Sequence, residues 1–176
     1  MNLFIGCSMN DKIDEKIKKT SKKLFDEIFK NNDLVFGACD SGLMGEAYKS
    51  ALKNKRNIIG ISPERYKDDF KKINCNKEIV TSDVSNNMDQ IIKESDCLLF
   101  INGGYGTMCE FFSSIERKRA GEFDKKIILF NDLNNPYFNL LLEFLKKMKE
   151  EGFSTEEQEE HYVVLNTIKE VMNYID

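Results

Sequence analysis

The feature that most constrains this chain is an alternation between short apolar runs and longer segments with helical periodicity. Runs such as Asp96–Ile101 and Lys126–Phe130 have the length of a strand but lack the regular polar alternation of a half-exposed one. Between the runs, apolar side chains recur three or four positions apart, as in the helix predicted over Thr107–Arg119. Buried strands separated by helices are typical of a parallel sheet. The alternation therefore predicts an α/β fold, a Rossmann-like parallel sheet with helices on both faces.

The same patterns set the expected order of elements along the chain. Strands are predicted over 2–7, 34–38, 57–61, 78–81, 96–101, 126–130 and 162–165. Helices are predicted over 11–31, 43–53, 84–94, 107–119, 137–150 and 167–175. Because a domain typically needs about 150 residues, the 176 residues are expected to form a single domain spanning 1–176.

Composition excludes several classes of function. The apolar runs are far shorter than the roughly 20 residues of a membrane span, so we expect no membrane partner. A net charge of −4 without a basic tail argues against nucleic acid. Five cysteines without a CxxC pair, and a single histidine, His161, predict neither disulfides nor a metal site. With no signal peptide apparent, we expect a cytoplasmic protein with reduced thiols.

Three strand-to-helix junctions are rich in small residues: Gly6–Ser8, Gly37–Gly45 and Asn102–Thr107. In open parallel sheets, ligands bind beyond the carboxyl ends of the strands, where helix N-termini attract anions. The third junction, with Gly103, Gly104 and Gly106, is the sharpest signal for a phosphate or ribose-phosphate site. The alternative, tight turns needed only for packing, stays open at this point.

Two familiar phosphate motifs are absent from these junctions. Gly37 and Gly42 have the glycine spacing of a Walker loop, but Leu43 and Met44 stand where Lys and Ser/Thr are required. Neither glycine-rich loop forms a GxGxxG motif with the acidic ribose ligand of a nicotinamide site. We therefore expect no dinucleotide cofactor.

Glu110 is the carboxylate of most interest. Thr107 and Glu110 fit the T-x-x-E capping box, so Glu110 could simply cap its helix. The same spacing could aim the carboxylate at a bound ribose, where it would stabilise an oxocarbenium-like centre or activate water. Spacing alone does not separate capping from catalysis.

The segment Asn102–Glu110 resembles the PGGxGTxxE signature of the Lonely Guy family. Ser41–Gly45 resembles the GLMG loop of that family, and Gly6–Ser8 its first-strand serine loop. Members are nucleoside 5′-monophosphate phosphoribohydrolases, several of them acting on cytokinin nucleotides. The resemblance implies hydrolysis of an N-glycosidic bond to a free base and ribose 5-phosphate, without metal or cofactor. Many members were labelled lysine decarboxylases, but no lysine here has a recognisable pyridoxal setting.

The resemblance also implies a homodimer, with the glycine-motif helix near the interface, and a phosphorylated small molecule as ligand. It makes Glu110 the catalytic acid. The phosphate- and ribose-binding residues that it implies are Gly103, Gly104, Tyr105, Gly106, Thr107, Ser8, Ser41, Gly42, Met44 and Gly45.

Four positions depart from the family pattern. Asn102 replaces the proline of the motif, and Cys109 replaces its penultimate acidic residue. Asn87 and Met88 occupy the positions of a catalytic Arg-Lys pair, which makes Asn87 a second candidate catalytic residue. An asparagine offers only a neutral amide where a guanidinium would form bidentate, charged hydrogen bonds. The sequence therefore supports two hypotheses, a phosphoribohydrolase and a nucleotide-binding protein of the same fold that does not hydrolyse its ligand.

Overall fold

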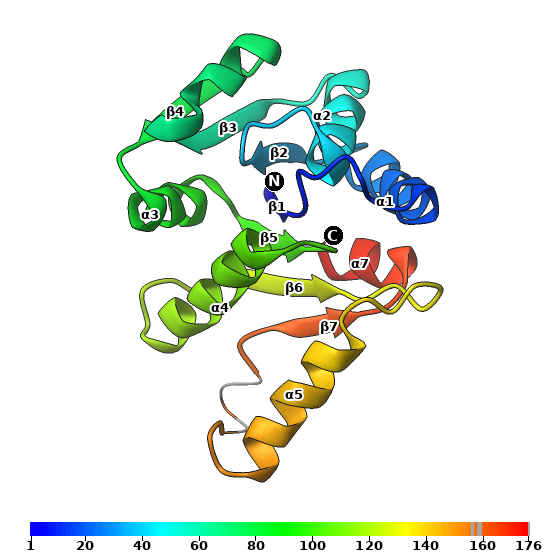
Figure 1. Cartoon of the computed structure of the whole chain (residues 1–176), viewed down its shortest axis with the longest axis vertical. Coiled ribbons are helices and arrows are strands. Elements are labelled where there is room, and N and C mark those ends of the chain that lie inside the picture. The colour runs from blue at the N-terminus through cyan, green and yellow to red at the C-terminus, as the bar shows by residue number, and fades with distance from the viewer. Residues whose placement is uncertain (156, 158–159, 176) are drawn as a thin grey trace.

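Seven parallel strands form one sheet in the computed structural model, which describes residues 1–155, 157 and 160–175. Their order is β4-β3-β2-β1-β5-β6-β7 (Figure 1). The strands are β1 (Asn2–Gly6), β2 (Asp33–Phe36), β3 (Ile58–Pro63), β4 (Lys77–Thr81), β5 (Cys97–Phe100), β6 (Lys126–Phe130) and β7 (Val163–Leu165). The predicted Rossmann-like α/β fold is confirmed.

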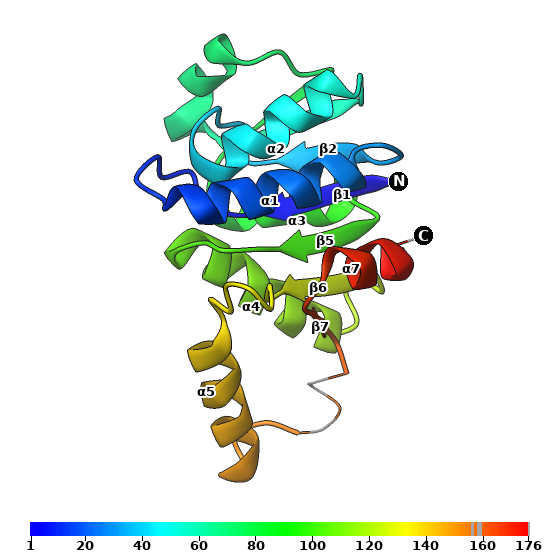
Figure 2. The same ribbon diagram turned by 90° about the vertical axis from the view of Figure 1, so that its right-hand side faces the viewer.

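Helices cover both faces of the sheet, as the sequence predicts. One face carries α1 (Glu15–Ile28), α2 (Gly42–Lys53) and α7 (Ile168–Ile175). The opposite face carries α3 (Val84–Glu94) and α4 (Tyr105–Arg119). The helix α5 (Asn139–Glu150) extends beyond β7, away from the sheet (Figure 1), and only Leu141 and Leu142 near its start pack against this core. Figure 2 shows α1 and α7 in front of the strands and α4 behind them. Among the described residues, no helix is long and apolar enough to cross a bilayer.

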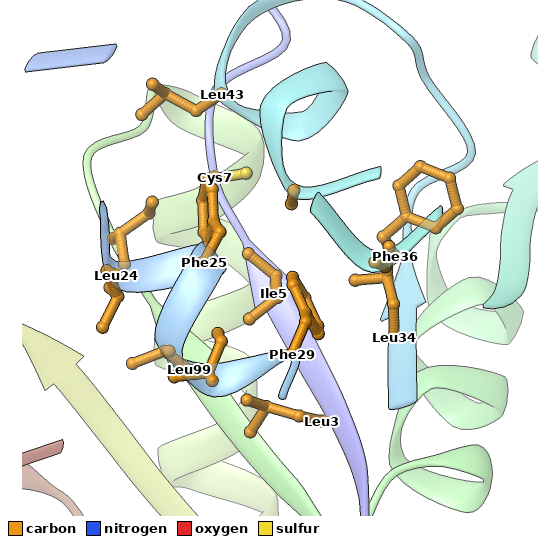
Figure 3. Packing of buried hydrophobic residues seen from close by; sticks show 14 of the residues in the cluster. Leu3, Ile5, Cys7, Leu24, Phe25, Phe29, Leu34, Phe36, Leu43 and Leu99 are labelled. Atoms are coloured by element: carbon orange, nitrogen blue, oxygen red, sulfur yellow. The ribbon is translucent and has the colours of Figure 1, made fainter. Parts of the chain in front are cut away.

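The sheet separates two apolar cores. Leu3 and Ile5 of β1 face α1, where they pack with Phe25 and Phe29 (Figure 3). Phe4 belongs to the core on the opposite face, because successive side chains of a strand point to opposite sides. All five side chains are almost completely buried. Burial of each stabilises the fold by roughly 1.5–3 kcal/mol, which fixes the positions of the strand ends that carry the site.

Three segments differ clearly from the sequence expectation. The helix predicted over 11–31 is shorter at both ends, since α1 spans Glu15–Ile28 with Asp14 as its N-cap. The helix predicted over Thr107–Arg119 begins two residues earlier, at Tyr105, with Gly104 as its N-cap. A 3-10 helix, η1 (Glu64–Lys72), connects β3 to β4 where no element was predicted. Only Phe70 of η1 is buried, and seven of its nine residues are charged, so the segment has too few apolar residues to predict a helix from periodicity.

Candidate functional site

The carboxyl ends of β1 and β5 mark the point where the strand order reverses. From β1 the chain builds β2, β3 and β4 on one side, and β5 then pairs with the other side of β1. Such a switch point opens a crevice between loops that leave toward opposite faces of the sheet. The two loops are joined by a hydrogen bond in which the Ser8 N–H donates to the Asn102 carbonyl at 3.1 Å.

A cavity of about 440 Å³ lies at this crevice. Seven of the candidate residues from the sequence line it: Ser8, Met44, Asn87, Gly104, Gly106, Thr107 and Glu110. The other five candidates are not among its lining residues: Gly103, Tyr105, Ser41, Gly42 and Gly45. Tyr105 instead directs its side chain into solvent, where it is 99% exposed.

The first turn of α4 offers unpaired hydrogen-bond donors to this cavity. The first N–H groups of any helix lack intrahelical acceptors. Within the described part of the chain, the N–H groups of residues 104–107 donate to no other atom. A side chain at Gly104 or Gly106 would meet nothing within 4 Å, so the space beside this turn is open to a ligand. Free amides at a helix N-terminus favour an anion such as phosphate.

Gly103 has a different role from its two neighbours in the motif. A Cβ atom added there would lie 2.1 Å from the Thr107 Oγ1, so any side chain would displace the start of α4. This glycine therefore allows the loop to pack closely against its own helix.

In the glycine loop before α2, the backbone N–H groups donate hydrogen bonds to other atoms of the protein. The Gly42 N–H donates to the Asp11 carboxylate at 2.9 Å. The N–H groups of Leu43 and Met44 both donate to the Ser8 carbonyl, at 2.9 and 3.2 Å, and the Gly45 N–H donates to Ser41. Gly42 has a φ of +60°, a conformation that favours glycine. This loop thus fixes α2 against the β1 loop, and its amides, unlike those of the first α4 turn, have acceptors within the protein.

Glu110 lies in the second turn of α4 and lines the cavity. Because Gly104 is the N-cap, Thr107 lies inside the helix, and the capping-box interpretation of Glu110 is wrong. Burial raises the pKa of Glu110 from 4.5 to about 7. A carboxyl group with this pKa can both donate and accept a proton near neutral pH.

No lysine or arginine from the described residues lines the cavity. Arg117 pairs with Asp89 at 2.8 Å and with Glu122, outside the cavity. Arg56 donates to a backbone carbonyl, and the guanidinium of Arg65 lies over the Tyr66 ring. An anion in this cavity would therefore contact N–H groups of the backbone and of side-chain amides, and no cation from the described residues.

Asn87 provides one such amide. It is only 9% exposed, and the Thr81 hydroxyl donates to its Oδ1 at 3.1 Å. This hydrogen bond leaves the Nδ2 hydrogens as the donors that Asn87 can offer to a ligand. Met88, by contrast, is buried in the core beneath α3 and does not line the cavity.

Several lining residues had no counterpart in the sequence interpretation. Ile61, Ser62 and Pro63 end β3, and Tyr66 and Asp69 belong to η1. Their place in the chain could have predicted them, because the loop after β3 must open at the same edge of the sheet as the loops after β1 and β5. Met9, Asn10 and Val84 are also unpredicted lining residues. The other lining residues, Cys7, Gly37, Cys39 and Cys109, lie within the junctions and the motif that the sequence singled out.

The cavity chemistry centres on Glu110. Burial, reinforced by the nearby Glu110 and Cys39, raises the pKa of the Cys7 thiol well above its usual value, so this thiol stays neutral and a poor nucleophile. Across residues 1–155, 157 and 160–175, no three His, Cys, Asp or Glu side chains gather as metal ligands. Proton transfer at one carboxyl group, beside a set of unpaired backbone amides, is the chemistry that this arrangement offers.

Known structures share this fold. The Moco carrier protein of Chlamydomonas reinhardtii superposes with a TM-score of 0.68 at 18% identity, over 99% of this chain and 94% of that one. The molybdenum cofactor binding protein of Rippkaea orientalis superposes with a TM-score of 0.69, also at 18% identity and with the same coverage. At this identity the likeness establishes the fold.

Sequence relatives establish the family. A family model described as "Possible lysine decarboxylase" matches residues 44–175. Cytokinin riboside 5'-monophosphate phosphoribohydrolase LOG3 of Arabidopsis thaliana is 30% identical over 176 residues, which cover 99% of this chain and 80% of LOG3. LOG1 of the same plant, with the same enzyme name, is 30% identical over 86% of this chain and 70% of its own. The chain belongs to the Lonely Guy family.

Proposed function

We propose that this protein is a phosphoribohydrolase that cleaves the N-glycosidic bond of a nucleoside 5′-monophosphate. One observation carries the proposal: the Glu110 carboxyl, whose pKa burial raises to about 7, lines the same cavity as the unpaired amides of the first α4 turn. The names of its relatives, cytokinin riboside 5'-monophosphate phosphoribohydrolases, support the same reaction.

The spacing along α4 suits a ribose 5-phosphate. At 1.5 Å of rise per residue, Glu110 lies roughly 5 Å along the helix beyond Thr107, about the span of a ribose ring. A phosphate held by the amides of residues 104–107 would then place the anomeric carbon near the Glu110 carboxyl. Met44, Ile61 and Val84 contribute apolar surface to the cavity, against which a base can pack.

In the proposed reaction, the protonated Glu110 donates its proton to the leaving nitrogen of the base as the bond between that nitrogen and the anomeric carbon breaks. The carboxylate left behind stabilises the positive charge on the ribose ring. Water then adds to the anomeric carbon, and its proton returns to Glu110. The products are the free base and ribose 5-phosphate, and the carboxyl group is regenerated.

The second candidate is a protein that binds a nucleotide without hydrolysing it. The observation that favours it is the replacement of the family arginine by Asn87, in a cavity whose lining residues in this structure include no cation. A neutral amide stabilises a developing negative charge less than a guanidinium does.

Release of base from a panel of purine and pyrimidine nucleoside 5′-monophosphates separates the two candidates. The hydrolase predicts release by the native protein and its loss in Glu110→Gln, while Glu116→Gln on the exposed side of the same helix retains it. No release, together with nucleotide binding detected by calorimetry, would establish the binding protein instead. Neither release nor binding would refute both.

A further inference from the structure

A tyrosine outside the family motif contacts the glycine loop. Tyr137 lies between β6 and α5, and its hydroxyl donates to the Gly103 carbonyl at 2.7 Å. The two residues are 34 positions apart in the chain. This hydrogen bond joins the loop that carries the anion-binding amides to the next strand-to-helix connection along the sheet.

The hydrogen bond orients the whole peptide unit between Gly103 and Gly104, not only the carbonyl. In a planar trans peptide, the C=O of one residue and the N–H of the next point in opposite directions. The carbonyl of Gly103 and the N–H of Gly104 belong to the same peptide unit. By holding the carbonyl, Tyr137 therefore also sets the direction of the Gly104 N–H, which is one of the unpaired donors of the site.

This peptide unit needs an external restraint because glycines flank it on both sides. Glycine permits backbone conformations that side chains would exclude, so steric contacts alone do not prevent rotation of the unit. Nothing lies within 4 Å of the place where a Gly104 side chain would begin. A rotated peptide would present the Gly103 carbonyl oxygen, rather than an N–H, to a bound phosphate.

Tyr137 is 51% exposed, and its ring is anchored on one side by its neighbour in the chain. Its ring packs edge-on against Phe138, with the ring centroids 4.9 Å apart, and Phe138 is 1% exposed. The Phe138 N–H donates to the Asn131 side chain at 2.9 Å. The Asn131 Nδ2 in turn donates to Asn139 at 3.0 Å. The backbone next to Tyr137 is thus fixed by the buried Phe138 and by the Asn131 amide, and from it the Tyr137 hydroxyl reaches Gly103.

We propose that Tyr137 is a positioning residue, which holds the 103–104 peptide so that the Gly104 N–H faces the ligand phosphate. The inference rests on the proposed function, because it requires a phosphorylated ligand at α4. It predicts that the Tyr137 hydroxyl contributes to recognition of the phosphate and not to recognition of the nucleoside.

The test is calorimetric binding of adenosine 5′-monophosphate and of adenosine, in a Glu110→Gln background so that the nucleotide survives. Tyr137→Phe removes one hydroxyl and keeps the ring contact with Phe138. Weakening of one hydrogen bond to a charged group predicts about a tenfold loss of affinity for the monophosphate. Affinity for adenosine should stay within twofold. Tyr174→Phe on α7, far from the cavity, is the matched control and should change neither.

The outcomes separate this inference from the function on which it rests. If the parent protein binds the monophosphate no better than adenosine, both proposals fail. If the parent prefers the monophosphate and Tyr137→Phe keeps the full preference, the positioning role alone is refuted. Equal weakening of both ligands would also refute it, because that result marks a general structural role for Tyr137.

Discussion

The buried Glu110 carboxyl should make the folded protein less stable as the pH rises. Replacing Glu110 by a neutral residue should abolish this loss of stability. With a pKa of 4.5 in the unfolded chain and about 7 in the folded one, the native state binds this proton more tightly. Unfolding free energy therefore falls between pH 4.5 and 7 and carries the full penalty above pH 7. At 1.36 kcal/mol for each tenfold change, that penalty is about 3 kcal/mol.

Glu110→Gln replaces the carboxyl by a neutral group of similar size at every pH. Relative to the native protein, it should gain about 1 kcal/mol from this source at pH 5 and about 3 kcal/mol at pH 8. Urea unfolding at both pH values measures the gain, and far-UV circular dichroism suits a chain without tryptophan.

Glu116→Gln on the same helix is the control. Its carboxylate is exposed and pairs with Arg119, which lowers the pKa of Glu116, so this variant should gain no stability as the pH rises. The reasoning is refuted if the difference between native protein and Glu110→Gln is the same at pH 5 and pH 8, or if the variant is the less stable protein at pH 8. Either result would mean that Glu110 is not a desolvated acid.

Three further predictions concern the same cavity, and a fourth concerns the loop before α2. If protonated Glu110 donates a proton to the base, kcat should fall as the pH rises through about 7; a rise would show that the carboxylate is the active form. Asn87→Arg should lower the pKa of Glu110 by at least one unit, because a nearby cation favours the carboxylate. In an Asn87→Arg background, the stability gained at pH 8 on adding Glu110→Gln should therefore be smaller than in the native background. Gly106→Ala should leave urea stability within about 1 kcal/mol but weaken monophosphate binding at least tenfold, since the added methyl enters open space at the cavity. Gly45→Ala should instead destabilise the fold by about 3 kcal/mol or more in the same urea assay, because its Cβ would lie 2.1 Å from the Asp40 carbonyl oxygen.

The order of strands and helices was predictable because it depends on local apolar periodicity. The start of α4 was less so: Thr107 and Glu110 have the spacing of a capping box, yet the helix begins at Tyr105 after a glycine N-cap. A cap with no side-chain hydrogen bond leaves little trace in the sequence.

The two glycine loops also looked more alike in sequence than they are in the structure. Whether their amides are free depends on acceptors elsewhere in the chain, such as the Ser8 carbonyl and the Asp11 carboxylate that occupy the α2 loop. The contact between Tyr137 and Gly103 spans 34 positions and follows no local pattern. Such long-range pairing, rather than residue type, decides which motif is open to a ligand.

A crystal structure of Glu110→Gln with a bound nucleoside 5′-monophosphate tests the central claim most directly. The account predicts phosphate oxygens within about 3 Å of the N–H groups of residues 104–107, with the anomeric carbon beside the side chain of residue 110. A phosphate seated at the start of α2, or a ribose turned away from residue 110, would contradict it.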